Sequence, residues 1–125
     1  MADDPIPADL RDFILRFIDS VAHLEALLLL RAHPETAWES PAVATRLYTS
    51  AEQAGEVLAQ LCDEGLLDCE EGLYRYRGQA PEHIAMVDRL ADSYAKQLIP
   101  ITNMIHSKPR RIRQFADAFK FRKDR

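Results

Sequence analysis

Charged and aromatic side chains with potential for chemistry gather between Tyr48 and Gly78, in the stretch YTSAEQAGEVLAQLCDEGLLDCEEGLYRYRG. Arg75 and Arg77 alternate there with two tyrosines, a pattern that suits contact with nucleic-acid phosphates and bases. The same stretch carries a larger set of carboxylates, which repel phosphates and attract basic protein surfaces. These acidic residues are Glu52, Glu56, Asp63, Glu64, Asp68, Glu70 and Glu71. A strand with its tyrosines packed inward and its arginines in water also explains the alternation, and we favour that simpler interpretation.

No set of residues has the spacing that catalysis or metal binding needs. None of the histidines lies four residues from another, and neither cysteine lies at a metal-ligand spacing from a histidine. The histidines are His23, His33, His83 and His106. The chain has only four glycines, too few for a phosphate-binding loop, and no serine–histidine–aspartate signature of a nucleophile. We therefore expect no enzyme activity, no metal and no cofactor.

Length and composition indicate one globular domain. The chain of 125 residues is 47% hydrophobic, which is enough for a real core. No apolar run approaches the ~20 residues that span a bilayer, so we expect no membrane partner. The N-terminus is acidic and lacks the regions of a signal peptide, which favours a cytoplasmic protein. The spacing of Cys62 and Cys69 allows a disulfide, but without an export signal we predict two reduced thiols.

Periodicity and capping signals divide the chain into five parts. Ser20 and Ser50 are typical helix caps, Gly65 is a typical helix end, and Glu71–Gly72 predicts the turn of a hairpin. The parts that we expect are a flexible arm (1–8), an N-terminal helix (9–19), a unit of three helices and a hairpin (20–78), a long helix (79–106) and a basic amphipathic tail (107–125).

The long helix carries an apolar residue at every third or fourth position, which is the heptad pattern of a helix that packs along its length. These residues are Ile84, Val87, Ala91, Tyr94, Leu98, Ile101 and Ile105. This seam can form a homodimer interface or pack on the helix of residues 9–19 within one chain, and we favour the dimer. Pro100 interrupts the pattern and should kink the helix or split it in two.

The order of helix, short strand, helix, capped helix and hairpin over residues 20–78 resembles a winged helix-turn-helix domain. The stretch LAQLCDEGLLDCEEGLYRYRG is similar to the passage of bacterial winged-helix regulators in which the recognition helix ends and the wing begins. The residues of that signature are Leu61, Asp63, Glu64, Gly65, Leu66 and Leu67. With the helices on either side, the chain resembles the MarR and PadR families of transcriptional regulators. The resemblance implies a mainly α fold with a small β-hairpin wing and long N- and C-terminal helices.

The resemblance makes the helix that starts at Ser50 the recognition helix, whose first turns would enter the DNA major groove. Gln53 could read an adenine edge there, and glutamates can accept from cytosine. The other candidates for DNA contact in this unit are Arg46, Thr49, Arg75 and Arg77. Residues 20–78 hold four basic and ten acidic residues, however, whereas DNA-binding faces are usually basic.

The tail has the opposite charge. Residues 108–125 contain eight basic and two acidic residues, a net charge of +6, whereas residues 1–107 have a net charge of −10. The candidates for phosphate contact in the tail are Lys108, Arg110, Arg111 and Arg113. Phe115 and Phe119 form an apolar stripe, which favours docking on DNA, an acidic protein or a partner subunit over a solvated end.

Two functions fit these observations best. The first is a homodimeric transcriptional regulator that binds DNA through its wing and its basic tail. The alternative is a protein-interaction module whose acidic face docks on a basic partner without reading DNA. That face consists of Glu52, Glu56, Asp63 and Glu64. A third option is a small-ligand sensor with a pocket near Trp38 or Tyr94.

Overall fold

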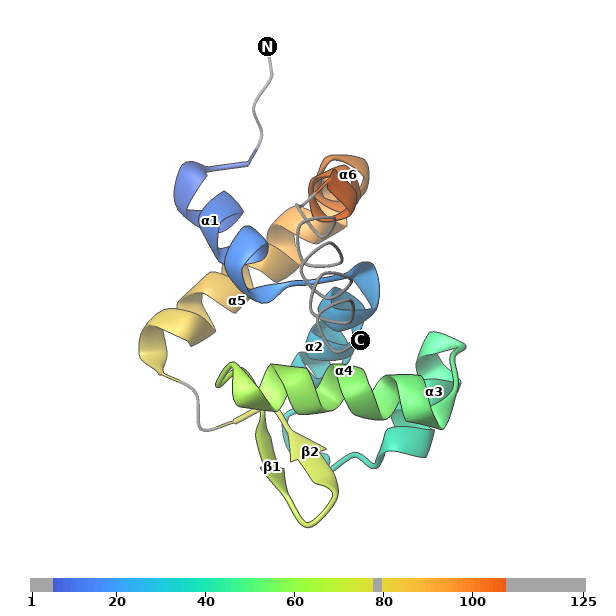
Figure 1. Ribbon diagram of the computed structural model, residues 1–125. Coiled ribbons are helices and arrows are strands. Elements are labelled where there is room, and N and C mark those ends of the chain that lie inside the picture. The colour runs from blue at the N-terminus through green and yellow to red at the C-terminus, as the bar shows by residue number, and fades with distance from the viewer. Residues whose placement is uncertain (1–5, 78–79, 108–125) are drawn as a thin grey trace, which may run out of the picture.

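Helices and one antiparallel hairpin make up the part of the chain that the computed structural model describes, residues 6–77 and 80–107 (Figure 1). The elements are α1 (Ala8–Phe17), α2 (Val21–Ala32), α3 (Ser40–Leu47), α4 (Ala51–Asp63), β1 (Asp68–Glu70), β2 (Leu73–Arg75), α5 (Pro81–Lys96) and α6 (Leu98–Ser107). The predicted mainly α class with a small hairpin is confirmed, and its arrangement is compatible with the winged-helix expectation. Predictions made for residues 1–5 and for the basic tail from Lys108 lie outside the described residues.

Helix α2 forms the centre of the core. Its apolar residues follow one another almost without a break, so the helix buries more than one face. Leu24, Leu27 and Leu30 are fully buried, and α2 contacts α3, α4 and α6. The predicted cap is present, since the Ser20 hydroxyl accepts a hydrogen bond from the backbone N–H of His23 at 3.3 Å.

Helices α3 and α4 pack closely against each other and are joined by a tight turn. Ser50 caps α4, because its hydroxyl accepts from the backbone N–H of Gln53 at 3.0 Å, which is one half of the predicted capping box. Leu58 and Leu61 project from α4 into the core and are fully buried. This packing leaves the opposite face of α4 on the surface.

The hairpin follows α4 directly. Strands β1 and β2 pair with Asp68 opposite Arg75, and Glu71 and Gly72 have φ angles of 55° and 79°. Two successive positive φ values are typical of the type I′ turn, whose twist matches that of a hairpin. Strand β2 is also tied to the segment before α3, because Trp38 and Tyr74 exchange two backbone hydrogen bonds of 2.9 Å. The hairpin projects from α4 on the side away from α1 and α6 (Figure 1).

The segment expected as a long helix that Pro100 kinks or splits forms two helices. Helix α5 ends at Lys96, Gln97 leaves the helical region at φ −134° and ψ 55°, and α6 begins at Leu98. Pro100 explains the break, because its ring would clash with the carbonyl of Lys96 four residues earlier and it has no N–H to donate. Within the first turn of α6 the same proline is tolerated.

Helix α1 packs on α5 and α6 rather than on the hairpin side of the molecule. Its Phe17 ring meets the imidazole of His83 with the ring centroids 5.2 Å apart. Arg89 of α5 donates to both carboxylate oxygens of Asp9 at 2.7 and 2.9 Å. Contacts between residues that are far apart in the chain therefore stabilise the layer formed by α1, α5 and α6.

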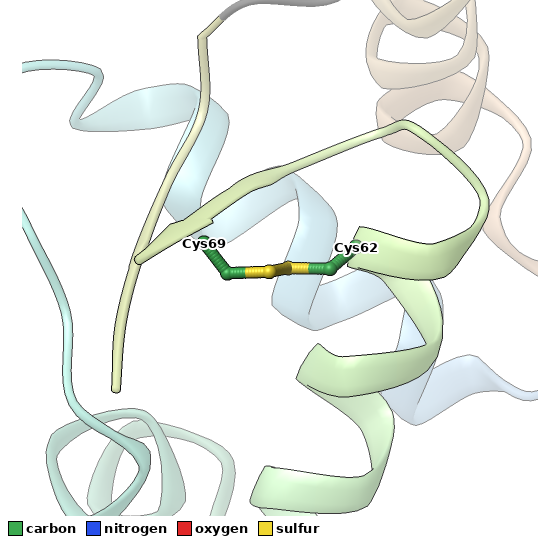
Figure 2. Close-up of a disulfide and its surroundings, with 2 residues drawn as sticks. All are labelled: Cys62 and Cys69. Atoms are coloured by element: carbon green, nitrogen blue, oxygen red, sulfur yellow. A yellow bond between two sulfur atoms is a disulfide. The ribbon is translucent and has the colours of Figure 1, made fainter. Parts of the chain in front are cut away.

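The prediction of two reduced thiols is wrong. Cys62, in the last turn of α4, and Cys69, in β1, form a disulfide (Figure 2). Gly65 lies between them with φ of 81°, a left-handed conformation that ends the helix and reverses the chain. The reversal brings the two Cα atoms within 6.2 Å, which is inside the usual range for a disulfide.

A buried polar network connects the α1–α2 turn to α4. Gln60 donates to Asp19 at 2.6 Å, and its carbonyl oxygen lies 3.1 Å from Nε2 of His23. Nδ1 of His23 lies 2.7 Å from the hydroxyl of Ser20. Asp19 and His23 are both buried, so these contacts supply hydrogen bonds to polar groups that are largely removed from water.

Candidate functional site

The outer face of α4 and the adjoining hairpin form the candidate site. Gln53 is exposed near the start of α4, flanked by the exposed carboxylates of Glu52 and Glu56, while Thr49 before the helix is half-buried. Ser50 orders this end of the helix through its capping bond. The predicted side chains therefore share one accessible surface, and that surface is acidic.

Tyr48 belongs to the same surface, although the sequence analysis did not single it out. The side chain is 95% exposed, and the residue ends α3 in the left-handed conformation with φ of 58°. Glycine or asparagine normally occupies such a position, because a Cβ costs about 1–2 kcal/mol there. An aromatic residue two positions before the capping Ser50 was the signal that could have revealed it.

The arginines predicted to contact phosphates occupy different environments. The guanidinium of Arg46 lies over the Trp38 ring, 5.3 Å from its centroid. Arg75 is half-buried in β2 and directly opposite Asp68. Arg77 is exposed just beyond β2. Arg46 and Arg77 are therefore the two exposed arginines of this site, whereas Arg75 is partly covered.

The tyrosines of the hairpin face inward, as predicted. Tyr76 is buried, and Tyr74 packs against the core. Burial, followed by the nearby charge of Asp88, raises the pKa of Tyr76, whose hydroxyl has no hydrogen-bond partner among the described residues. Tyr76 is therefore not available for base stacking, and Tyr74 is partly covered by its packing against the core.

Carboxylates continue from α4 onto the hairpin. Asp63 is exposed and Glu64 is half-buried at the end of α4, and every residue of β1 is exposed. One side of the hairpin carries an open hollow of about 270 Å³. Its lining residues are Asp68, Glu70, Glu71, Leu73, Arg75 and Arg77. Glu70 and Glu71 thus extend the predicted acidic face along the hairpin.

The residues of the predicted dimer seam are divided between the interior and the surface. Val87, Ile101 and Ile105 are fully buried within the chain. Ala91 and Tyr94 are half-buried, and Tyr94 donates to Glu25 of α2 at 3.2 Å. The remaining members, Ile84 and Leu98, are 38% and 52% exposed, and Ile99 beside Leu98 is 66% exposed. Intrachain packing thus uses most of the seam.

The other predicted contact residues lie outside the part of the chain described by the structure. These residues are Lys108, Arg110, Arg111, Arg113, Phe115 and Phe119.

The structure offers little for the remaining site types. No group of three or more histidine, cysteine or acidic residues within 6–77 and 80–107 could hold a metal ion. Across the same ranges, no helix is both long and apolar enough to cross a membrane. The hollows at the hairpin include neither Trp38 nor Tyr94, the residues suggested for a ligand pocket.

Comparisons with protein-family models, with curated proteins and with solved structures found no match for this chain.

Proposed function

We propose that this protein is a winged-helix regulator of transcription that binds DNA and takes its phosphate contacts from the hairpin and the basic tail. The observation that supports the proposal is the succession of α3, a tight turn, α4 and the hairpin, with the first turn of α4 exposed. The pairing of Trp38 with Tyr74 adds the short strand expected before α3. In a winged helix-turn-helix domain, this arrangement presents the second helix to the major groove.

Electrostatics decide how such a protein would hold DNA. Glu52 and Glu56 flank Gln53 on α4, so this helix repels phosphates at close range. The neutralising cations must come from elsewhere, and Arg77 together with residues 108–125, with their net charge of +6, supplies them. In this arrangement, Gln53 and the two glutamates form hydrogen bonds with base edges and not with the phosphate backbone of the DNA.

A homodimer is part of the proposal, with a narrower interface than the full seam. Leu98 and Ile99 are adjacent, apolar and more than half exposed at the start of α6, which makes them the side chains to meet a second copy. Measuring the mass of the native protein in solution tests this part. A monomer at micromolar concentration contradicts it.

DNA binding is tested with the full-length protein and a labelled duplex of random sequence, titrated at low and at physiological salt. Replacing the tail cations Lys108, Arg110, Arg111 and Arg113 together by Gln should weaken binding at low salt by about 10- to 100-fold. The matched control replaces Arg11 and Arg16 of α1, which is remote from the hairpin, and should change the affinity by less than about twofold. Wild-type protein that shows no binding at low salt rejects the proposal.

A specific observation favours a second candidate, an interaction module for a basic protein surface. Two of the three arginines of the candidate site are engaged by Trp38 or opposed by Asp68, while the carboxylates of α4 and β1 remain exposed. The double substitution Glu52→Lys and Glu56→Lys separates the two functions. It should strengthen a contact with DNA phosphate and weaken a contact with a basic protein.

A further inference from the structure

The bond between Cys62 and Cys69 lies at the surface of the molecule. Cys69 is exposed, Cys62 is half-buried, and both line an open hollow of about 290 Å³, together with other residues of α4 and the hairpin. Reagents that exchange thiols and disulfides reach a sulfur only where the surroundings are open to them. This pair is therefore placed for reversible chemistry, unlike a disulfide inside a core.

Strand β1 depends on this bond more than β2 does. All three residues of β1 are exposed, whereas β2 is anchored by its two hydrogen bonds to Trp38 and by the inward tyrosines. Besides its pairing with β2, β1 is held by the buried residues Leu66 and Leu67 that precede it and by the disulfide. Breaking the bond removes the covalent attachment of β1 to α4.

We propose that Cys62 and Cys69 form a redox switch. The oxidised pair holds strand β1 of the hairpin against α4, and reduction releases β1. The hairpin is part of the candidate site, so the switch changes the shape of that surface. The switch operates whether or not this surface binds DNA, and it can be followed without a ligand.

The reaction is a thiol–disulfide exchange with a small-molecule or protein disulfide. The thiolate of Cys69, the more exposed residue, attacks one external sulfur, which forms a mixed disulfide and releases one external thiol that takes up the proton. Cys62 then loses its proton and attacks the Cys69 sulfur, releasing the second external thiol. Two electrons pass from the cysteine pair to the external disulfide, and reduction runs the same steps backwards.

The charges around the pair select its exchange partner. Asp63, Glu70 and Glu71 line the same hollow as the two sulfurs. These carboxylates repel an anionic reagent such as glutathione and attract a cationic one. The partner that fits this site is a disulfide or dithiol carried on a positively charged molecule.

The partner preference is tested by oxidising the reduced protein with cystamine, which is cationic, and with oxidised glutathione, which is anionic. Cystamine should react about tenfold faster at low salt, with the difference shrinking at high salt. The combined substitutions Glu70→Gln and Glu71→Gln should reduce the ratio. Equal rates with both reagents at low salt contradict the proposed preference.

Reversibility is tested by incubating the full-length protein in buffers of varied reduced-to-oxidised glutathione ratio and counting free thiols by alkylation. The fraction with two free thiols should follow the ratio along the same curve from either starting state. A native protein that stays fully reduced in every buffer, or fully oxidised in excess dithiothreitol, overturns the switch.

Release of the strand is tested by hydrogen exchange of the backbone amides of residues 68–75 in the oxidised and reduced wild-type protein. Exchange should be about tenfold faster after reduction, while the amides of α2 remain unchanged. The variant Cys69→Ser should match the reduced protein in both buffers. Hairpin exchange that is identical in the two wild-type states shows that the bond does not hold the strand and overturns the proposal.

Discussion

The unit of α2, α3, α4 and the hairpin differs from the layer of α1, α5 and α6 in how its parts are held together. In the first unit, local devices such as the Ser50 cap and the Cys62–Cys69 bond fix the geometry of α4 and the hairpin, and longer-range contacts such as the Trp38–Tyr74 pairing add to them. In the second, the main contacts join distant segments, as the Asp9–Arg89 pair does. The candidate site thus owes much of its geometry to interactions within short segments, whereas the layer of α1, α5 and α6 depends on contacts between distant segments.

The two regions also treat their apolar residues differently. The apolar residues of α4 face a core that lies almost entirely within its own unit, against α2 and α3. The heptad seam of α5 and α6 instead divides, with Ile101 and Ile105 buried in the chain and Leu98 exposed. A heptad pattern indicates that a helix has an apolar face. It does not distinguish a partner within the same chain from a partner in a second copy.

The largest expected effects come from opening a cavity in either region. Leu58→Ala in α4 and Ile105→Ala in α6 each truncate a fully buried side chain, so each should lower the free energy of unfolding by about 2–5 kcal/mol. Chemical denaturation followed by circular dichroism measures both losses. Glu56→Ala is the control, since this exposed side chain on α4 should cost less than about 1 kcal/mol.

The pair of cavity variants also tests whether the two regions form one cooperative unit. If they do, both variants unfold in a single transition with similar losses. A second transition, or a stability of Ile105→Ala equal to that of the wild type, would mean that the layer unfolds separately from the α4 unit.

A smaller effect is expected from the polar network that connects the α1–α2 turn to α4. Gln60→Ala removes the hydrogen bonds to Asp19 and His23 and should cost about 1–3 kcal/mol, because buried polar groups lose partners. The control is Gln53→Ala, which changes an exposed side chain on the same helix and keeps the capped N–H. Equal stabilities of the two variants in thermal or chemical unfolding would show that the network adds nothing.

The opposite sign is expected at the turn before α4. Tyr48→Gly should raise the free energy of unfolding by about 0.5–1 kcal/mol, because glycine adopts the left-handed conformation without a Cβ penalty. Tyr48→Ala keeps the penalty and removes the ring, so it should give no such gain. A Tyr48→Gly variant that is more stable but binds ligand more weakly would show that backbone strain is stored at the candidate site. It would thereby sharpen the difference between the α4 unit and the layer of α1, α5 and α6.

The smallest effect is expected from the exposed ion pair of the second region. Hydrogen bonding to Arg89 lowers the pKa of Asp9 to about 2. The folded-state pKa lies below that of an unfolded aspartate, so the contribution is present above about pH 4 and is lost as the pH falls through 2. Asp9→Asn should therefore lower the melting temperature slightly at pH 6 and leave it unchanged well below pH 2.

The control for this pair is Asp12→Asn, since Asp12 lies on the same helix, is exposed and has no ion pair among the described residues. Its melting temperature should follow that of the wild type at both pH values. An equal loss at pH 6 for both aspartate variants would assign the effect to the net charge of α1 instead of the contact with α5.

The local structure of the candidate site was largely predictable. Ser50 as a cap, Gly65 as a helix end and Glu71–Gly72 as a hairpin turn were all confirmed, because each acts through backbone geometry within a few residues. The same reasoning missed Tyr48, whose unusual conformation breaks the rule that predicts glycine there. Sites that violate a local rule are found from the structure.

The sequence by itself therefore determined the helices and the hairpin, together with the acidic charge of the surface that α4 and the hairpin share. Periodicity, capping and charge are properties of short segments, and they need no knowledge of distant partners. Only the tertiary structure decided that Cys62 meets Cys69, that Arg46 lies over Trp38 and that α1 packs on α5 and α6. These contacts depend on how the chain reverses at Gly65 and breaks at Gln97, and packing then selects among the partners that each apolar or charged face would accept.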